Sequence, residues 1–546
     1  MTQTLDLKKL ASLSPFELKN FLISAASHHG EQLLLNAGRG NPNFLATVPR
    51  HGYHQFGLFA MSEAERSFSY MPEGVGGFPD RDGIEARFDI FTSQRRDVPG
   101  IEFIRNSVSY VRDQLGLSAA DFIYEMSEAL LGCMYPVPDR MLKMSEKIVA
   151  QYIRKEMVNG YPAFCGSFDL FAVEGGTAAI TYLFTALKEN HHLKPGDSIA
   201  LGLPIFTPYI EIPELSDYKL VEVGIQAELK DDWQFSKKEL DKLLDPKIKA
   251  FFLVNPSNPP SVRMSDASLK HLAGIVKKRP DLIILTDDVY GTFADDFTSI
   301  FALCPQNTIL VYSFSKYFGA TGWRLGVIAA HENNIFDDAI AKLPEATLRA
   351  LDKRYTSIAT EPRKLKFIDR LVAESRTVAL NHTAGLATPA QVQMVMFSLF
   401  SLMDEEENYK KAMKRLIRRR KAALYRDIPL KPRDDQNDVD YYHVLNMEVL
   451  GPQLFEPEFI NWLMGRLQPN EFLFALAEKA NVVLLPNSGF GDCHPSARVS
   501  LANLTEVQYA QIGSSLYELM KEYYAQYQQD HAAQKLKNKS APSRKK

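Results

Sequence analysis

The clearest pattern along the chain is a series of short apolar runs without polar alternation. Such runs are typical of strands that are buried on both faces of a parallel sheet. Most of the segments between them are long enough for a helix, as at 266–278, which is the β-α-β order of a sheet covered by helices. The pattern therefore predicts an α/β fold with a mostly parallel central sheet flanked by helices. The runs are 198–203, 250–254, 282–286, 308–312 and 325–330.

The pattern changes after about residue 405, where a charged helix is predicted over 406–423. Apolar runs at 442–449 and 482–485 follow, mixed with further helices. This predicts a smaller α+β domain, and we expect both ends of the chain to contribute to it. The predicted domains are an N-terminal extension with part of the small domain (1–160), a large domain (161–405) with an inserted charged helical segment (333–379), and a C-terminal small domain (406–530).

Length and composition agree with a large protein of several domains. With 546 residues the chain is too long for one hydrophobic core, and 45% apolar residues are ample for several domains. A net charge of −3 does not indicate the strongly basic composition that is typical of nucleic-acid-binding proteins. The basic end of the chain predicts a disordered tail over 531–546. Contact of that tail with nucleic acid or a membrane is the weaker alternative.

The cysteines and the N-terminus bear on the compartment. Four widely spaced cysteines without a C-x-x-C pair favour free thiols over disulfides or a metal site. The first residues have neither a basic start nor an apolar core, and no run approaches membrane-spanning length. We therefore expect a cytoplasmic protein with no metal and with no nucleic-acid or membrane partner.

A lysine framed by small hydroxyl residues stands between two predicted strands. The segment reads Ser313-Phe314-Ser315-Lys316, and Arg324 follows eight positions after the lysine. Pyridoxal phosphate chemistry needs an amine that forms a Schiff base, hydroxyls that hold a phosphate and a guanidinium that pairs the dianion. Lys316 is the candidate amine, Ser313 and Ser315 are the hydroxyls, and Arg324 is the guanidinium. Alone, the segment is equally a polar loop, because short motifs recur by chance.

Two neighbouring strand ends carry polar residues that suit the same cofactor. The run at 282–286 ends in Asp287, and a carboxylate there would keep the pyridine nitrogen protonated. An Asp at an ordinary turn is the alternative. After the run at 250–254, proline-fixed backbone presents Asn258. Asn258 and Tyr290 are predicted to reach the cofactor's phenolic oxygen.

A glycine pair, Gly175-Gly176, opens a predicted helix upstream, where backbone N–H groups can approach an anion. Four elements thus follow in order: the glycine turn, Asn-Pro, Asp-x-x-Tyr, and Ser-x-Ser-Lys with its Arg. Along about 160–330 this order resembles the fold-type I, class I/II aminotransferase family of pyridoxal phosphate enzymes. The resemblance implies that Gly176 and Thr177 bind the phosphate and that Phe206 stacks on the pyridine ring. Phenylalanine keeps the π-face but lacks the hydrogen-bonding group of the usual Trp or Tyr.

Two arginines are candidates for substrate binding. Arg498 begins an apolar run near the C-terminus, where this family places the guanidinium that binds the substrate's α-carboxylate. A surface arginine before a strand is the alternative. Arg39, in Gly38-Arg39-Gly40, matches the family's glycine loop at the substrate entrance, where most relatives have a small or aliphatic residue. A cation there suggests a dicarboxylic substrate or a reaction other than simple transamination.

Several features narrow the resemblance. The loop with Arg39, the long N-terminal region, the segment at 333–379 and the Cys-Met-Tyr-Pro sequence at Tyr135 are together similar to aspartate 4-decarboxylases, over essentially the whole chain. This implies β-decarboxylation of L-aspartate to L-alanine and CO₂ through a ketimine, with minor aspartate aminotransferase activity. It also implies homodimers that share active sites and assemble into larger oligomers. Tyr135 would reach the neighbouring subunit's cofactor phosphate, and Thr383 would lie near the substrate.

Two other functions share parts of these motifs. An ordinary aspartate, aromatic or alanine-type aminotransferase would use the same cofactor residues, so these motifs do not separate it from a decarboxylase. A regulator with an aminotransferase-like domain would need a DNA-binding module, and neither chain end shows a helix-turn-helix pattern with a basic face. For the decarboxylase we expect Lys316 as the general base, with Tyr290 and Arg39 in the catalytic set.

Overall fold

The computed structural model describes residues 15–26, 34–215, 221–376, 385–466, 469–491 and 494–540. The chain divides into two compact units. The larger unit comprises residues 44–257 and 263–412, and the smaller unit comprises residues 1–43, 258–262 and 413–546. Both units are therefore assembled from separate stretches of the sequence.

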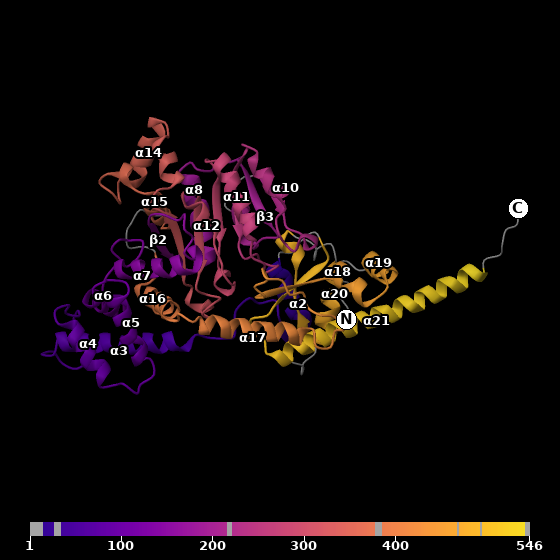
Figure 1. Cartoon of the computed structure of the whole chain (residues 1–546), viewed down its shortest axis with the longest axis horizontal. Coiled ribbons are helices and arrows are strands. Elements are labelled where there is room, and N and C mark those ends of the chain that lie inside the picture. Colours follow the sequence, from indigo (N-terminus) through magenta and orange to yellow (C-terminus); the bar gives the residue numbers. More distant parts are fainter. Residues whose placement is uncertain are drawn as a thin grey trace. The chain divides into compact units, whose positions relative to one another are not determined.

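A seven-stranded sheet forms the centre of the larger unit (Figure 1). Its strand order is β2-β8-β7-β6-β5-β3-β4; β8 pairs antiparallel with β2 and with β7, and the other neighbouring strands pair parallel. All five predicted runs are strands, and the α/β fold class is confirmed. The edge strands β2 and β4 are not among the predicted runs. The strands are β2 (Phe168–Val173), β3 (Ser198–Leu203), β4 (Val221–Gln226), β5 (Ile248–Val254), β6 (Ile283–Asp287), β7 (Thr308–Ser313) and β8 (Gly326–His331).

Strand β8 departs from the predicted β-α-β order. The connection from β7 to β8 holds residues 314–325, with one 3₁₀ turn at Thr321–Trp323 and no crossover helix. Because a parallel connection needs a crossover, usually a helix, the chain turns back here and Ser313 pairs with Gly326. We call residues 314–325 the return loop. It carries the lysine and the arginine of the sequence motif.

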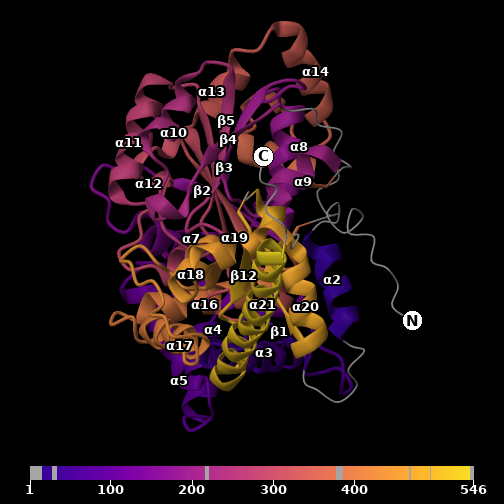
Figure 2. The ribbon, with the colours of Figure 1, turned by 90° about the vertical axis from the view of Figure 1, so that its right-hand side faces the viewer.

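Helices cover both faces of this sheet. Figure 2 shows α10, α11 and α12 on one face and α8 and α9 on the other. Helix α11 spans the predicted 266–278 and begins after Ser265, whose hydroxyl accepts a hydrogen bond from the Ser268 N–H. Its buried Leu269 and Leu272 belong to one apolar core with strands β3 to β6. The helices on the sheet are α8 (Gly176–Glu189), α9 (Pro208–Leu215), α10 (Lys237–Leu240), α11 (Asp266–Lys278) and α12 (Ile300–Leu303).

Further helices of the larger unit lie before and after the sheet in sequence. The charged segment predicted at 333–379 contains α13, α14 and α15. Figure 1 shows α3 to α6 grouped beside α7 and α16. The helices are α3 (Thr47–Ser67), α4 (Ile84–Ser93), α5 (Ile101–Asp113), α6 (Ala119–Leu131), α7 (Lys143–Ile153), α13 (Ile335–Ala341), α14 (Glu345–Tyr355), α15 (Phe367–Ser375) and α16 (Thr388–Met403).

The smaller unit contains an antiparallel sheet of order β11-β12-β9 and a parallel pair, β1-β10. The pairing of β1 with β10 brings the N-terminal segment into this unit. Helix α17 runs from the larger unit into the smaller one. The elements are α2 (Pro15–Ala26), β1 (Leu35–Asn36), α17 (Asn408–Leu424), β9 (Tyr442–Asn446), α18 (Met447–Leu454), α19 (Pro457–Arg466), α20 (Pro469–Ala480), β10 (Val482–Val483), β11 (Leu485–Pro486), β12 (Ser496–Ser500) and α21 (Glu506–Ser540).

The C-terminal end differs from the predicted disordered tail. Helix α21 continues to Ser540, so residues 531–540 are helical. This stretch contains Ala, Gln, Lys and Leu, which are good helix formers, and lacks Pro and Gly. Its composition therefore extends the helix despite the basic charge. Residues 541–546 lie outside the described residues.

Candidate active site

The predicted phosphate-binding residues meet where β2 and β7 end and β8 begins. Val173 of β2 and Ser313 of β7 both pair with Gly326 of β8, so the glycine turn and the return loop start at the same edge of the sheet. The carboxyl ends of strands are where open α/β sheets bind ligands.

Glycine at position 175 makes room for Arg324. Gly175 has a φ of +88°, and a Cβ there would lie 2.6 Å from Nη2 of Arg324. The Ser313 hydroxyl donates a hydrogen bond to the Ser315 hydroxyl at 3.0 Å. Helix α8 begins at Gly176, so its free N–H groups lie at the same turn. Backbone donors, two hydroxyls and a guanidinium at one turn are a set of groups that could hold an anion, and we call them the cradle.

Asp287 ends β6 and is buried, with 4% of its surface exposed. Burial raises the pKa of Asp287 to about 7, although the N–H of Val289 and the charge of Lys316 lower it. The next residue, Asp288, is also buried, and burial raises its pKa to about 7. Within the described part of the chain, neither carboxylate forms a salt bridge. Asp287 is therefore a desolvated acid that would gain from a cationic ligand.

Two buried polar atoms beside this strand end have no hydrogen-bond partner among the described residues: Tyr209 Oη and Asn255 Nδ2. Burial and then the charges of Asp287 and Asp288 raise the pKa of Tyr209 far above its ordinary value. The Asn255 N–H donates to the Asp287 carbonyl at 3.0 Å. Because such orphaned atoms are rare in folded proteins, they fit a site that receives a polar ligand. Sequence reasoning missed both residues.

The remaining predicted residues of the larger unit are placed as follows. Lys316 is half-buried in the return loop, and Tyr290 is buried just after β6. Phe206 is half-buried after β3, and Thr177 is exposed in the first turn of α8. Tyr135 is 69% exposed between α6 and α7. Thr383 lies outside the described residues.

Arg498 lies on β12 in the smaller unit and is 5% exposed. Its Nη1 donates to Oδ1 of Asn258 at 3.0 Å and its Nη2 donates to the Gly38 carbonyl at 2.9 Å. The ring centroids of Tyr442 and Phe490 lie 4.2 and 4.9 Å from its Cζ. Its buried Nε has no partner among the described residues. The guanidinium is thus fixed in direction by neutral groups, and its charge stays available for a carboxylate.

The loop that carries Arg39 is anchored within the same unit. The Ser500 N–H donates to the Ala37 carbonyl at 2.7 Å, and the Tyr441 hydroxyl donates to the Gly40 carbonyl at 2.8 Å. Arg39 itself is exposed. Burial and then the charge of Arg39 lower the pKa of Lys19 on α2. Lys19 is a second cation near this loop that sequence reasoning missed.

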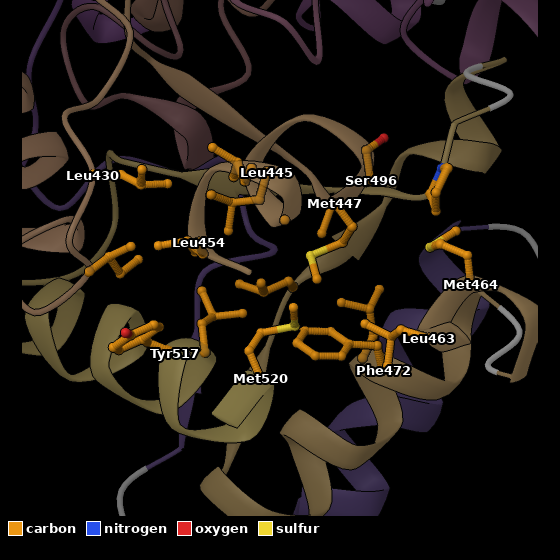
Figure 3. A pocket seen from close by; sticks show the side chains of 18 of the residues that line it. Leu430, Leu445, Met447, Leu454, Leu463, Met464, Phe472, Ser496, Tyr517 and Met520 are labelled. Atoms are coloured by element: carbon orange, nitrogen blue, oxygen red, sulfur yellow. The ribbon is translucent and has the colours of Figure 1, made fainter. Parts of the chain in front are cut away.

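The smaller unit also contains an apolar cavity of about 80 Å³ (Figure 3). Its lining includes Leu445, Met447, Leu454, Phe472 and Met520. The described residues that line it include no charged side chain. An apolar wall does not suit a phosphate or a carboxylate, so this cavity is separate in chemistry from the candidate site.

Three further findings concern metal ligands, membrane-spanning helices and cysteines. Within the described ranges, no cluster of His, Cys, Asp or Glu could hold a metal ion. No described helix is long and apolar enough to cross a membrane. Cys133, Cys165 and Cys304 are free thiols, whereas Cys493 lies outside the described residues.

The class of protein follows from comparison with known families. The model of the family Aminotransferase class I and II matches residues 149–516, and the chain belongs to this family. Enzymes of this family use pyridoxal phosphate. The donor set above fits that cofactor, since it offers an anion cradle, a desolvated acid for a ring N–H and a lysine on the same loop as the cradle's arginine.

One relative is similar over nearly the whole chain. The bifunctional aspartate aminotransferase and L-aspartate β-decarboxylase of Pseudomonas sp is 57% identical over 524 residues, which cover 96% of this chain and 98% of the relative. Solved structures agree in fold. The aspartate aminotransferase from Rhizobium meliloti has a TM-score of 0.59 at 15% identity and covers 95% of this chain and 99% of its own. A Thermus thermophilus aspartate aminotransferase single mutant has a TM-score of 0.57 at 15% identity and covers 95% and 100%.

Proposed function

We propose that the protein is a pyridoxal phosphate enzyme that converts L-aspartate to L-alanine and CO₂ and has minor aspartate aminotransferase activity. The 57% identity to the Pseudomonas enzyme over 96% of the chain carries this proposal. The side chains within each unit support it: the larger unit contains most of the proposed cofactor residues, and the smaller unit contains a buried guanidinium that suits a carboxylate.

The cofactor would be held by residues of several strand ends. When bound, pyridoxal phosphate supplies an aldehyde for the lysine and a ring that withdraws electrons from the substrate. Asp287 would hold the ring N–H, and Phe206 would stack on the ring. Asn258 and Tyr290 would bind the phenolic oxygen. The phosphate ligands would be Gly176, Thr177, Ser313, Ser315 and Arg324, with Tyr135 from a second subunit.

Lys316 would move the protons of the reaction. Its amine takes the proton from Cα of the substrate and later returns a proton, so one side chain serves as base and acid. Asp287 supports this step by keeping the ring nitrogen protonated. Burial holds the pKa of Asp287 near 7 in the cofactor-free protein. A cationic N–H in contact would draw that pKa down and leave the carboxylate charged.

Arg498 would bind the α-carboxylate of aspartate. Its two hydrogen bonds go to neutral oxygens, so an incoming carboxylate does not have to displace a protein carboxylate. The flanking rings of Tyr442 and Phe490 hold the guanidinium plane. A fixed α-carboxylate orients the bonds at Cα, which is the condition for fast proton transfer.

Arg39 would orient the distal carboxylate, the group lost as CO₂. A strong bidentate clamp would stabilise the charged ground state more than the transition state, in which that charge is being lost. The exposure of Arg39 agrees with a loose grip, because solvent weakens the attraction between charges. Thr383 stays a predicted substrate neighbour that the described residues do not include.

We also propose that the protein is a homodimer that assembles into a larger oligomer. Exposed apolar side chains concentrate in residues 45–137; the most exposed of these are Tyr70, Val137 and Tyr135, and Phe78 is 61% exposed. Large apolar patches on a surface mark interaction sites. Light scattering should give a mass of several subunits, and Phe78→Glu should lower it. The predicted cytoplasmic location stays a prediction.

The decisive experiment supplies aspartate labelled at the distal carboxylate and no keto acid. A decarboxylase should form many alanine molecules per subunit with one labelled CO₂ for each. An ordinary aminotransferase should stop after about one turnover per subunit, because no keto acid restores its cofactor. Lys316→Ala should lose the visible absorbance band and multiple turnover. Alanine limited to one per subunit in the wild type would contradict the proposal.

A further inference from the structure

An arginine from α3 holds the backbone directly after Lys316. Arg50 Nη1 donates to the carbonyls of Ala46 and Phe318, at 2.6 and 3.1 Å, and its Nη2 donates to the Gly319 carbonyl at 2.8 Å. Gly319 has a φ of +64°, and a Cβ there would lie 1.9 Å from the Phe44 carbonyl. The return loop therefore passes so close to the chain before α3 that no side chain fits between them.

A second side chain holds the same loop. The Tyr409 hydroxyl donates to the Tyr317 carbonyl at 2.9 Å. The Phe318 ring stacks on Phe397 and on Tyr409, with centroid distances of 4.6 and 6.2 Å and an interplanar angle of 11° in each case. Arg50 Cζ lies 5.2 Å from the Phe397 centroid. Three consecutive carbonyls after the lysine thus accept hydrogen bonds from side chains outside the loop.

We propose that Arg50 is a positioning residue for the reactive amine, because its fork fixes the Phe318 and Gly319 carbonyls and thereby sets the direction in which Lys316 leaves the backbone. This inference rests on the proposed role of Lys316. It adds a residue that lies outside the matched family region of 149–516.

The placement of the charge supports a positioning role. Burial lowers the pKa of Arg50, and no carboxylate forms an ion pair with it among the described residues. Burying a cation against neutral oxygens costs free energy that two neutral donors would not cost. The guanidinium is a rigid, planar group with two donors, and it therefore fixes the distance between the two carbonyls that it binds. Such rigidity matters most next to a residue that carries a reactive atom, here the proposed amine of Lys316, since a small misplacement of that atom slows the reaction strongly.

The test compares Arg50→Ala and Arg50→Lys with Arg66→Ala. Arg66 lies on the same helix, and its recorded ion pair is with Glu63 at 3.4 Å, away from the return loop. The first measurement is amide hydrogen exchange at 317–320 in the cofactor-free protein. We expect exchange about tenfold faster or more in both Arg50 variants, since each loses the fork, and no change in Arg66→Ala.

The second measurement uses the loaded enzyme. Both Arg50 variants should keep the visible band but shift the pH midpoint of its titration by about half a unit or more, because the amine sits in a changed position. We expect kcat to fall about 10- to 100-fold with KM changed less than about threefold. Methylguanidine added to Arg50→Ala should restore part of kcat. If Arg50→Ala does not fold, Arg50→Lys carries the test.

The outcomes separate this inference from the proposed function. Loss of the band in Lys316→Ala assigns the reactive amine to Lys316. Wild-type exchange at 317–320 and a wild-type pH midpoint in Arg50→Lys would then overturn the positioning role while the function stands. A band that persists in Lys316→Ala would instead overturn the assignment of the amine.

Discussion

Arg140 in the larger unit and Arg498 in the smaller unit are both mostly buried, but their partners differ. Arg140 pairs with the carboxylates of Glu146, Asp169 and Asp369, each at 3.0 Å. Arg498 donates only to an amide oxygen and a backbone carbonyl among its recorded hydrogen bonds. A guanidinium saturated with protein carboxylates is a structural link. One held by neutral oxygens keeps its charge for a ligand.

The buried acids show the same contrast. Glu374 is paired with Arg354 and also accepts a hydrogen bond from the Tyr355 hydroxyl at 2.7 Å. Asp287 has no salt bridge among the described residues, and burial raises its pKa to about 7. The protein thus compensates the buried charge of Glu374 but leaves that of Asp287 for a cationic ligand to compensate.

The largest expected effect concerns Asp287 in the cofactor-free protein. Its pKa is raised from 3.8 to about 7, so the folded state keeps a proton that the unfolded state loses. The resulting stabilisation is complete below pH 3.8 and is lost as the pH rises to 7, up to about 4 kcal/mol. Asp287→Asn should remove this part of the pH dependence, as measured by denaturant unfolding between pH 4 and 8.

Asp288→Asn is the matched control, because burial raises the pKa of Asp288 to about 7 as well. It should remove a similar part of the pH dependence but keep cofactor affinity, whereas Asp287→Asn should weaken cofactor binding and slow the reaction. Equal cofactor affinity in the wild type and both variants would make Asp287 a turn residue.

The next effect concerns Arg498. Arg498→Ala should lower kcat/KM for decarboxylation and for transamination alike, by about 2–4 kcal/mol or roughly 30- to 1,000-fold, since charge-assisted hydrogen bonds to the α-carboxylate are lost. Steady-state kinetics with aspartate measure this. A loss confined to one activity would show that Arg498 does not bind a group used in both.

Arg140→Ala tests whether Arg140 is a structural arginine, in contrast to Arg498. Removing the cation leaves three carboxylates close together, so the free energy of unfolding should fall by about 2–3 kcal/mol, a value reduced for partial exposure. Denaturant unfolding measures this change. We expect kcat/KM per folded molecule to stay unchanged, and a loss as large as that of Arg498→Ala would remove the distinction between the two arginines.

The smallest expected effect concerns Arg39. Arg39→Ala should change the ratio of alanine formed to cofactor converted into its amine form by about three- to tenfold, roughly 1 kcal/mol. The reason is that loss of CO₂ depends on the orientation of the distal carboxylate. Product analysis gives the ratio. If the ratio is the same in the variant, Arg39 serves the structure of its loop.

The sequence points to candidate site residues in the larger unit because these residues stand at strand ends. Buried strands are recognisable as apolar runs, and Asp287 and Ser313 directly end two of them. Contacts between residues that are far apart in the sequence are not recognisable in this way. Asn258 was predicted as a cofactor ligand from its place after β5, and its contact with Arg498, 240 positions away, follows no local pattern.

The sequence also does not predict the direction of a strand or the burial of a polar residue. The apolar run of β8 predicts a strand, but its antiparallel direction depends on the return loop turning back rather than crossing the sheet. Tyr209 and Asn255 look like ordinary polar residues until their burial and missing partners are known. Arg50 reaches Phe318 across 268 positions, which no sequence spacing predicts.

The return loop also has a consequence for the order of folding. Ser313 and Gly326 pair across a short loop, whereas Val173 and Gly326 are separated by more than ten times as many residues. Closing the longer loop costs about 2 kcal/mol more in chain entropy. The β7–β8 pair should therefore form early, and it brings the lysine and the arginine of the cradle together before the glycine turn arrives with β2.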